Sequence, residues 1–64
     1  MAEISKKEQI LAAAAEVFNE TGYHSARVED IATRAGIGKG TVYEYFDSKR
    51  QLFEESIFYV LEKY

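Results

Sequence analysis

Basic side chains stand at three positions where helices are expected to begin: Arg27, Lys39 and Lys49. A cation is unfavourable beside the positive end of a helix dipole, so helix stability does not explain three in succession. Free N–H groups at a helix start bind anions, and an adjacent Lys or Arg completes such a site. A DNA backbone supplies phosphates at regular spacing. These positions therefore indicate phosphate contacts, although ordinary solvated helix faces carry the same residue types.

The segment after Lys39 carries groups that could face base edges or phosphates. Gly40 would let the backbone approach DNA closely, and Thr41 can offer a methyl to thymine or a hydroxyl to a base edge. Tyr43 and Tyr45 flank a buried stripe, so each ring packs inward while its hydroxyl can donate to a phosphate oxygen. Each is equally explained as a half-buried aromatic of a small core. Glu44 must accept from a cytosine amino group or be repelled by phosphate, and its role stays open.

Catalytic and metal-binding chemistry finds little support in the residues present. The chain has no Cys, and His24 is its only histidine. A lone His beside a helix start is most often a solvated surface group. The glycine-rich stretch 36–40 follows a helix rather than a strand and lacks the spacing of a nucleotide-binding loop. We therefore expect no enzyme activity, no cofactor and no metal site.

Helical periodicity predicts the elements that position these residues. Ser5 opens a capping box ahead of an apolar stripe, which predicts a helix over about 5–21. Gly22 is expected to end this helix in the left-handed conformation, with Tyr23 folding back onto Phe18.

Two short helices follow, over about 28–35 and 39–46, with Gly36 as the stop of the first. Val42 and Phe46 form the clear buried pair of the second. Two helices of this length joined by a glycine turn are typical of a helix-turn-helix, whose second helix presents a polar face to the major groove. A plain αα-hairpin in a helical bundle has the same spacing, so spacing alone leaves both open.

A fourth helix is predicted from Ser48 onward, with Gln51 completing a second capping box and no stop signal before the chain ends. Phe58 and Tyr59 fall off its apolar stripe. They are either scattered surface aromatics or face something outside this chain. A protein-interaction module that uses this side of the helix is the competing hypothesis. The stripe itself is expected at Phe53, Ile57, Val60, Leu61 and Tyr64.

Length, hydropathy and charge limit the class of protein. Sixty-four residues allow one small domain, and the absence of strand patterns makes it all-α. The longest apolar run, over 10–15, is too short to cross a bilayer. Residues 1–7 lack the basic start and apolar core of a secretory signal, so a cytoplasmic location is expected. The net charge of −3 alone argues against a nucleic-acid partner. However, residues 24–50 carry five basic and four acidic side chains, and the acidity lies in the flanks.

A series of short runs forms a distinctive pattern: Gly22-Tyr23, VEDIA at 28–32, AGIGKGTVYEYF at 35–46, DSK at 47–49, and Leu52. With this pattern, the chain from about Ile10 to Phe53 resembles the DNA-binding domain of TetR/AcrR-type transcriptional regulators. The resemblance implies a homeodomain-like helix-turn-helix domain over 1–47. It also implies that the fourth helix, over 48–64, links to a C-terminal domain absent from this chain.

The resemblance also implies a function. Such regulators respond to a ligand, are most often repressors, and bind a palindromic operator in double-stranded DNA as homodimers. The absent domain would dimerise and bind a small-molecule effector. The expected location is the bacterial or archaeal nucleoid, with no membrane partner. Lys39, Gly40, Thr41 and Tyr43 would lie at bases and adjacent phosphates, Tyr45 and Lys49 at phosphates, and Arg27 at the backbone.

Three sites depart from the family pattern. Ala26 and Arg27 stand where Thr and then Ser or Thr usually cap the second helix and touch a phosphate, so a charge would replace the hydroxyl there. Gly38 stands where Ser commonly caps the third helix, at a cost of only a few tenths of a kcal/mol. Glu44 stands where His is frequent, which leaves the base preference open.

Overall fold

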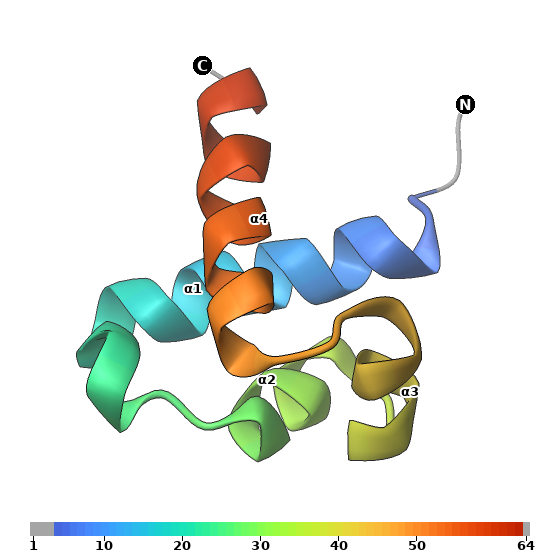
Figure 1. Cartoon of the computed structure of the whole chain (residues 1–64). Coiled ribbons are helices and arrows are strands. Elements are labelled where there is room, and N and C mark those ends of the chain that lie inside the picture. The colour runs from blue at the N-terminus through green and yellow to red at the C-terminus, as the bar shows by residue number, and fades with distance from the viewer. Residues whose placement is uncertain (1–3, 64) are drawn as a thin grey trace.

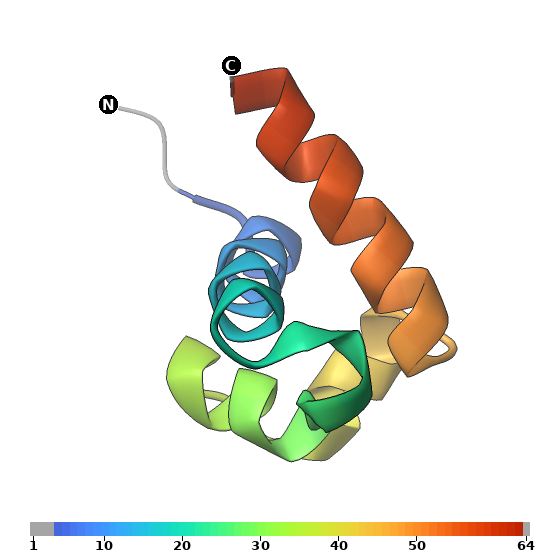
Figure 2. The same ribbon diagram turned by 90° about the vertical axis from the view of Figure 1, so that its left-hand side faces the viewer.

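Residues 4–63 are described by a computed structural model and form four helices, with no strand among those residues. α2 and α3 lie side by side beneath α1, and α4 rises across α1 (Figure 1). A quarter turn shows α1 end-on, with α4 slanting away from the α2–α3 pair (Figure 2). None of the helices in the described range is long and apolar enough to cross a membrane. The all-α prediction is confirmed, with α1 at Lys6–Ser25, α2 at Val28–Ala35, α3 at Lys39–Tyr45 and α4 at Lys49–Lys63.

One hydrophobic core joins the helices. Burying such a side chain contributes about 1.5–3 kcal/mol, whereas helices of seven or eight residues do not persist alone in water. α2 and α3 are therefore stable only through shared burial. Ala14 and Ala32 are buried too, and their small side chains let α1 and α2 pack closely. The fully buried large side chains come from every helix and from the residue after α3: Ile10, Ile31, Val42, Phe46 and Leu52.

The turn between α2 and α3 depends on Gly36. This residue lies in the left-handed region, at φ 77° and ψ 29°. Its N–H donates to the Thr33 carbonyl at 3.1 Å, and the Ile37 N–H donates to the Ala32 carbonyl at 3.0 Å. These two bonds form a Schellman motif, which confirms Gly36 as the stop of α2.

The end of α1 differs from the prediction. Gly22 has a positive φ of 81°, but its ψ of 166° is extended, so the left-handed cap predicted there is wrong. The Ala26 N–H bonds to the Gly22 carbonyl at 3.1 Å, so the chain begins a new turn instead of closing onto the old one. That turn carries the helical stretch through Ser25, beyond the predicted end at 21. The predicted contact is confirmed, because the Tyr23 ring stacks on Phe18 with centroids 6.0 Å apart.

Side-chain caps open α1 and α4. The Ser5 hydroxyl accepts from the Glu8 N–H at 3.1 Å, but within residues 4–63 no bond returns from the Ser5 N–H to the Glu8 carboxylate. The Ser48 hydroxyl accepts from the Gln51 N–H at 3.1 Å. The side-chain Oε1 of Gln51 accepts from the Asp47 N–H at 2.8 Å, one residue before the position that a standard capping box uses. α4 is therefore capped reciprocally and α1 from one side only.

The face that α4 turns inward matches the predicted stripe only in part: Phe53 packs against the core as predicted. Leu52 is fully buried and Tyr59 packs against the core, although neither was assigned to the inward stripe. Ile57 and Leu61, which were assigned to it, are exposed. Tyr64, the last predicted member, lies outside the described residues. The inward face is the one that meets α1, and it is not the most continuous apolar face of the helix.

An exposed ion pair ties α2 to α1. Two nitrogens of Arg34 donate to the two carboxylate oxygens of Glu20 at 2.7 and 2.8 Å, and one of them also contacts Glu16 at 3.5 Å. Hydrogen bonding from Arg34 holds the pKa of the Glu20 carboxyl below its ordinary value. The bidentate geometry fixes both side chains in one plane and so restrains α2 on the outside of the fold.

Replacing Gly36 with Ala should lower the free energy of unfolding by about 1 kcal/mol, because a Cβ is disfavoured in the left-handed region. No atom lies within 4 Å of the added Cβ, so the cost is conformational. Thermal unfolding by circular dichroism should show a Tm roughly 4–8 °C lower. Gly40→Ala is the matched control: this glycine lies in α3 with open space around its Cβ, so the Tm should rise. Equal effects of the two substitutions would contradict the assignment.

Acid should weaken the contribution of the Arg34–Glu20 pair to stability. Folding lowers the pKa of Glu20, so the contribution is complete above the unfolded pKa and is lost as pH falls through the folded one. We expect the difference in urea midpoint between the native chain and Glu20→Gln to be largest near neutral pH and to shrink in acid. All other carboxylates are common to the two proteins, so a difference that stays constant with pH would count against this role.

Candidate nucleic-acid interface

α2 and α3 begin without side-chain caps. Arg27 occupies the N-cap position of α2 and Gly38 that of α3, and neither makes a side-chain bond to the first turn. The Asp30 and Thr41 N–H groups donate to the Arg27 and Gly38 carbonyls. The N–H groups of the two helical residues before each of them are left for an acceptor outside the helix. Lys39, the first residue of α3, adds a positive charge beside them. Free N–H groups next to a cation are the arrangement that binds anions at helix starts.

The basic side chains separate into two groups by their partners. Lys7, Arg34 and Arg50 each form an ion pair with a Glu side chain. The second group makes no ion pair with any residue in the described range, and except for Lys6 its members stand at the starts of α2, α3 and α4. This group is Lys6, Arg27, Lys39 and Lys49.

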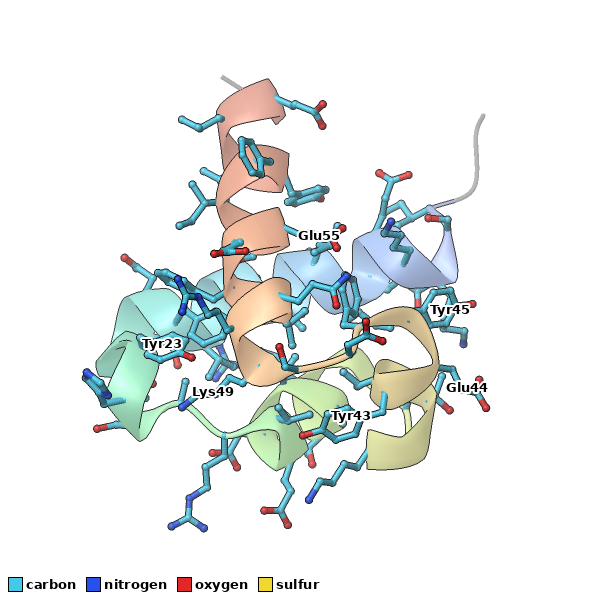
Figure 3. All side chains as sticks on the ribbon, in the orientation of Figure 1. Tyr23, Tyr43, Glu44, Tyr45, Lys49 and Glu55 are labelled. Atoms are coloured by element: carbon cyan, nitrogen blue, oxygen red, sulfur yellow. The ribbon has the colours of Figure 1, made fainter. Side chains whose placement is uncertain are left out.

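Lys49 has a structural role that its position at the start of α4 did not reveal. Its ammonium donates to the Tyr23 carbonyl at 2.9 Å and to the Ala26 carbonyl at 3.1 Å. It also lies 4.5 Å from the centroid of the Tyr23 ring, a cation–π contact. Figure 3 shows the side chain reaching from α4 to the connection between α1 and α2. An ammonium has three N–H donors, so one remains for another acceptor.

The outward face of α3 carries most of the predicted contact residues. Val42 is buried, and the helical repeat places Gly40 and Glu44 on the opposite side. Tyr43 and Tyr45 lie on the two flanks, and their side chains leave α3 on different sides (Figure 3). They are 43% and 42% exposed, so each ring is partly covered. The two hydroxyls therefore cannot meet on one acceptor.

The predicted residues occupy the start of α2, the whole of α3 and the start of α4. Residues 39–41, with Thr41 half-buried and the other two exposed, form the first turn of α3. Arg27 follows Ala26, whose carbonyl holds Lys49, so the chain brings these two cations into one region. The carbonyls of Tyr23 and Ala26 were missed as partners of Lys49, because main-chain acceptors leave no signal in residue type.

Comparison with known proteins places this arrangement in a family. Residues 10–56 match the family described as "Bacterial regulatory proteins, tetR family". The chain also resembles the crystal structure of a TetR-family transcriptional regulator from Mesorhizobium loti MAFF303099. The TM-score is 0.88 and the identity 38%, over 91% of this chain and 29% of that one.

Two relatives from other organisms show the same pattern of coverage. The HTH-type transcriptional activator FasR of Mycolicibacterium smegmatis is 46% identical over 48 residues, which are 75% of this chain and 22% of FasR. The icaADBC negative transcriptional regulator IcaR of Staphylococcus aureus is 37% identical over 51 residues, which are 80% of this chain and 27% of IcaR. The chain therefore spans less than a third of the length of these relatives. It belongs to the TetR family of bacterial regulatory proteins.

Proposed function

We propose that this chain is the DNA-binding part of a transcriptional regulator of the bacterial nucleoid, and that α3 enters the major groove of its operator. One observation carries the proposal: cations without acidic partners stand beside uncapped helix starts around α3. Cations elsewhere, such as Arg34 and Arg50, are neutralised by Glu. Lys6, on α1, is the exception among the described cations. A surface that gathers the other unpaired charges suits a polyanion that runs past several helix starts.

The contact residues follow from the placement of each side chain. Arg27 and the third N–H of Lys49 would bind phosphates at the starts of α2 and α4, and Tyr45 would bind a phosphate from one flank of α3. Phosphate contacts of this kind set the register of a domain on DNA without reading sequence. Residues that lie on α3 itself would meet bases and adjacent phosphates: Lys39, Gly40, Thr41 and Tyr43.

The longer protein would act as a homodimer on a palindromic operator. A single helix-turn-helix makes few contacts, and two linked half-sites multiply the affinity. We assign residues 1–47 to the DNA-binding domain and 48–64 to a helix that continues into a dimerising, effector-binding domain. Phe58 and Leu61, 65% and 64% exposed on α4, support contact between this helix and further chain.

We propose that binding to the operator represses transcription. We also propose that the chain has no catalytic activity. Occupying a promoter is enough to block transcription, whereas activation needs an additional productive contact. Related regulators include both activators and negative regulators of transcription, since FasR is named an activator and IcaR a negative regulator. A reporter gene placed under the operator should therefore become more active when the gene for the regulator is deleted.

Lys39→Met should weaken binding to duplex DNA and lower the salt slope of log K by about one, because one phosphate contact is lost. Fluorescence anisotropy of a labelled duplex, from low to physiological salt, measures both quantities. Lys63→Met, at the far end of α4, removes the same charge and is the matched control. Tyr45→Phe should reduce affinity and leave the slope unchanged, since it removes a neutral donor. If Lys39→Met and Lys63→Met changed the slope equally, the DNA surface would be misplaced.

Lys49→Met should reduce stability as well as DNA binding. Hydrogen bonds from a charged donor typically contribute 1.5–3 kcal/mol, so losing those to the Tyr23 and Ala26 carbonyls should lower the free energy of unfolding by about 1–3 kcal/mol. Lys39→Met is the control, because its exposed ammonium has no partner in the described structure and its loss should leave the Tm unchanged or slightly higher. Equal thermal stability of the two variants would show that the Lys49 contacts contribute nothing.

A further inference from the structure

The fold does not explain the acidic side chain on the outward face of α3. Glu44 is exposed and has no hydrogen bond or ion pair with any residue in 4–63. It lies in the last turn of α3, where the negative end of the helix dipole disfavours a carboxylate. Arg27 and Lys39, the cations assigned above to the DNA-facing surface, form no ion pair with it. Glu44 therefore stabilises neither its own helix nor a contact with another.

Glu44 lies on the outward face of α3, the helix that would enter the major groove. Gly40 lies one turn earlier on the same ridge, opposite the buried Val42. Helical side chains lean toward the N-terminus, so the Glu44 carboxylate extends over the turn that contains Gly40. A Cβ at Gly40 would meet no atom within 4 Å, so the surface at Gly40 is not covered by other parts of the protein. Figure 3 shows Glu44 extending away from the rest of the molecule.

We propose that Glu44 is a specificity-determining residue that selects a cytosine in the bound half-site. The inference rests on the proposed binding of α3 in the major groove. A carboxylate only accepts hydrogen bonds, and the cytosine N4 amino group only donates in that groove. Guanine presents acceptors at O6 and N7, and thymine presents one at O4. Adenine offers its N6 donor beside the N7 acceptor, which repels the second carboxylate oxygen.

Electrostatic repulsion between Glu44 and the DNA phosphates strengthens the preference for cytosine. A carboxylate near phosphates is repelled, so a half-site that leaves Glu44 without a donor carries an uncompensated cost. Arg27 and Lys39 offset the repulsion of the backbone for every sequence alike and do not relieve this local cost. Only a donor on the base edge does so. Discrimination therefore arises more from rejecting guanine and thymine than from attracting cytosine.

Selection from a random duplex library tests the proposal. The 64-residue chain is immobilised on beads at high density, and the DNA retained at low salt is sequenced. Cytosine should be enriched roughly tenfold at one position, as expected for a single base contact of 1–2 kcal/mol. Glu44→Ala should abolish the preference at that position only. Glu44→Gln should move it toward adenine, because an amide pairs with both N6 and N7.

Glu62→Gln is the matched control, since it removes the same charge from an exposed position on α4. It should bind DNA somewhat more tightly and keep the cytosine preference. Far-UV circular dichroism should be identical for all variants, because both glutamates are exposed. If Glu44→Ala kept the cytosine preference, or if DNA were bound with none in the native chain, the role of Glu44 would be refuted while DNA binding stood. If the native chain retained no DNA, the proposed function itself would fail.

Discussion

The shared burial of side chains from all four helices in one core is the constraint on which this structure depends. α2 and α3 have eight and seven residues, too few to remain helical alone in water. Ile31 and Val42 anchor them in one core cluster, which also contains Ile10 of α1 and Leu52 of α4. The angle between α2 and α3 is then set by Gly36, whose left-handed conformation closes the Schellman motif. The buried face of α3 provides the contacts that hold this helix in the fold. Its outer face is therefore free to carry side chains that do not stabilise the fold.

The composition of that outer face departs from what stability favours. α2 and α3 begin with Arg27 and Gly38 in place of capping hydroxyls, and Glu44 stands near the negative end of its helix. α1 and α4, in contrast, keep serine caps at Ser5 and Ser48. The capping rule is therefore obeyed at α1 and α4 and broken at α2 and α3, which is the pattern expected of a functional site at the α2–α3 surface. The net charge of −3 does not reveal this, because it sums over all surfaces.

The features predictable from sequence were those determined within a few residues. Gly36 as a helix stop, the Ser48 cap and the Tyr23–Phe18 contact all depend on neighbours in the chain. The face that α4 turns inward was predicted only in part, since Phe53 packs against the core but Ile57 and Leu61 are exposed. Ser56 is buried there and satisfies its hydroxyl by donating to the Phe53 carbonyl at 2.7 Å, so a polar residue occupies the inner side. Periodicity identifies the most apolar face of a helix, whereas packing against α1 selects the face that is buried.

The contacts of Lys49 were not predictable for a further reason, and they have a mechanical consequence. They link Lys49 to the main-chain carbonyls of Tyr23 and Ala26, which lie 26 and 23 positions earlier in the chain. No pattern of residue types encodes such main-chain acceptors. Through them, the start of α4 is tied to the segment that leads directly into Arg27 and α2. Any displacement of α4 that moves Lys49 must either break both hydrogen bonds or carry the connection between α1 and α2 with it. The start of α2 is therefore mechanically coupled to α4 through a side chain, although the two helices are separated along the chain by α3.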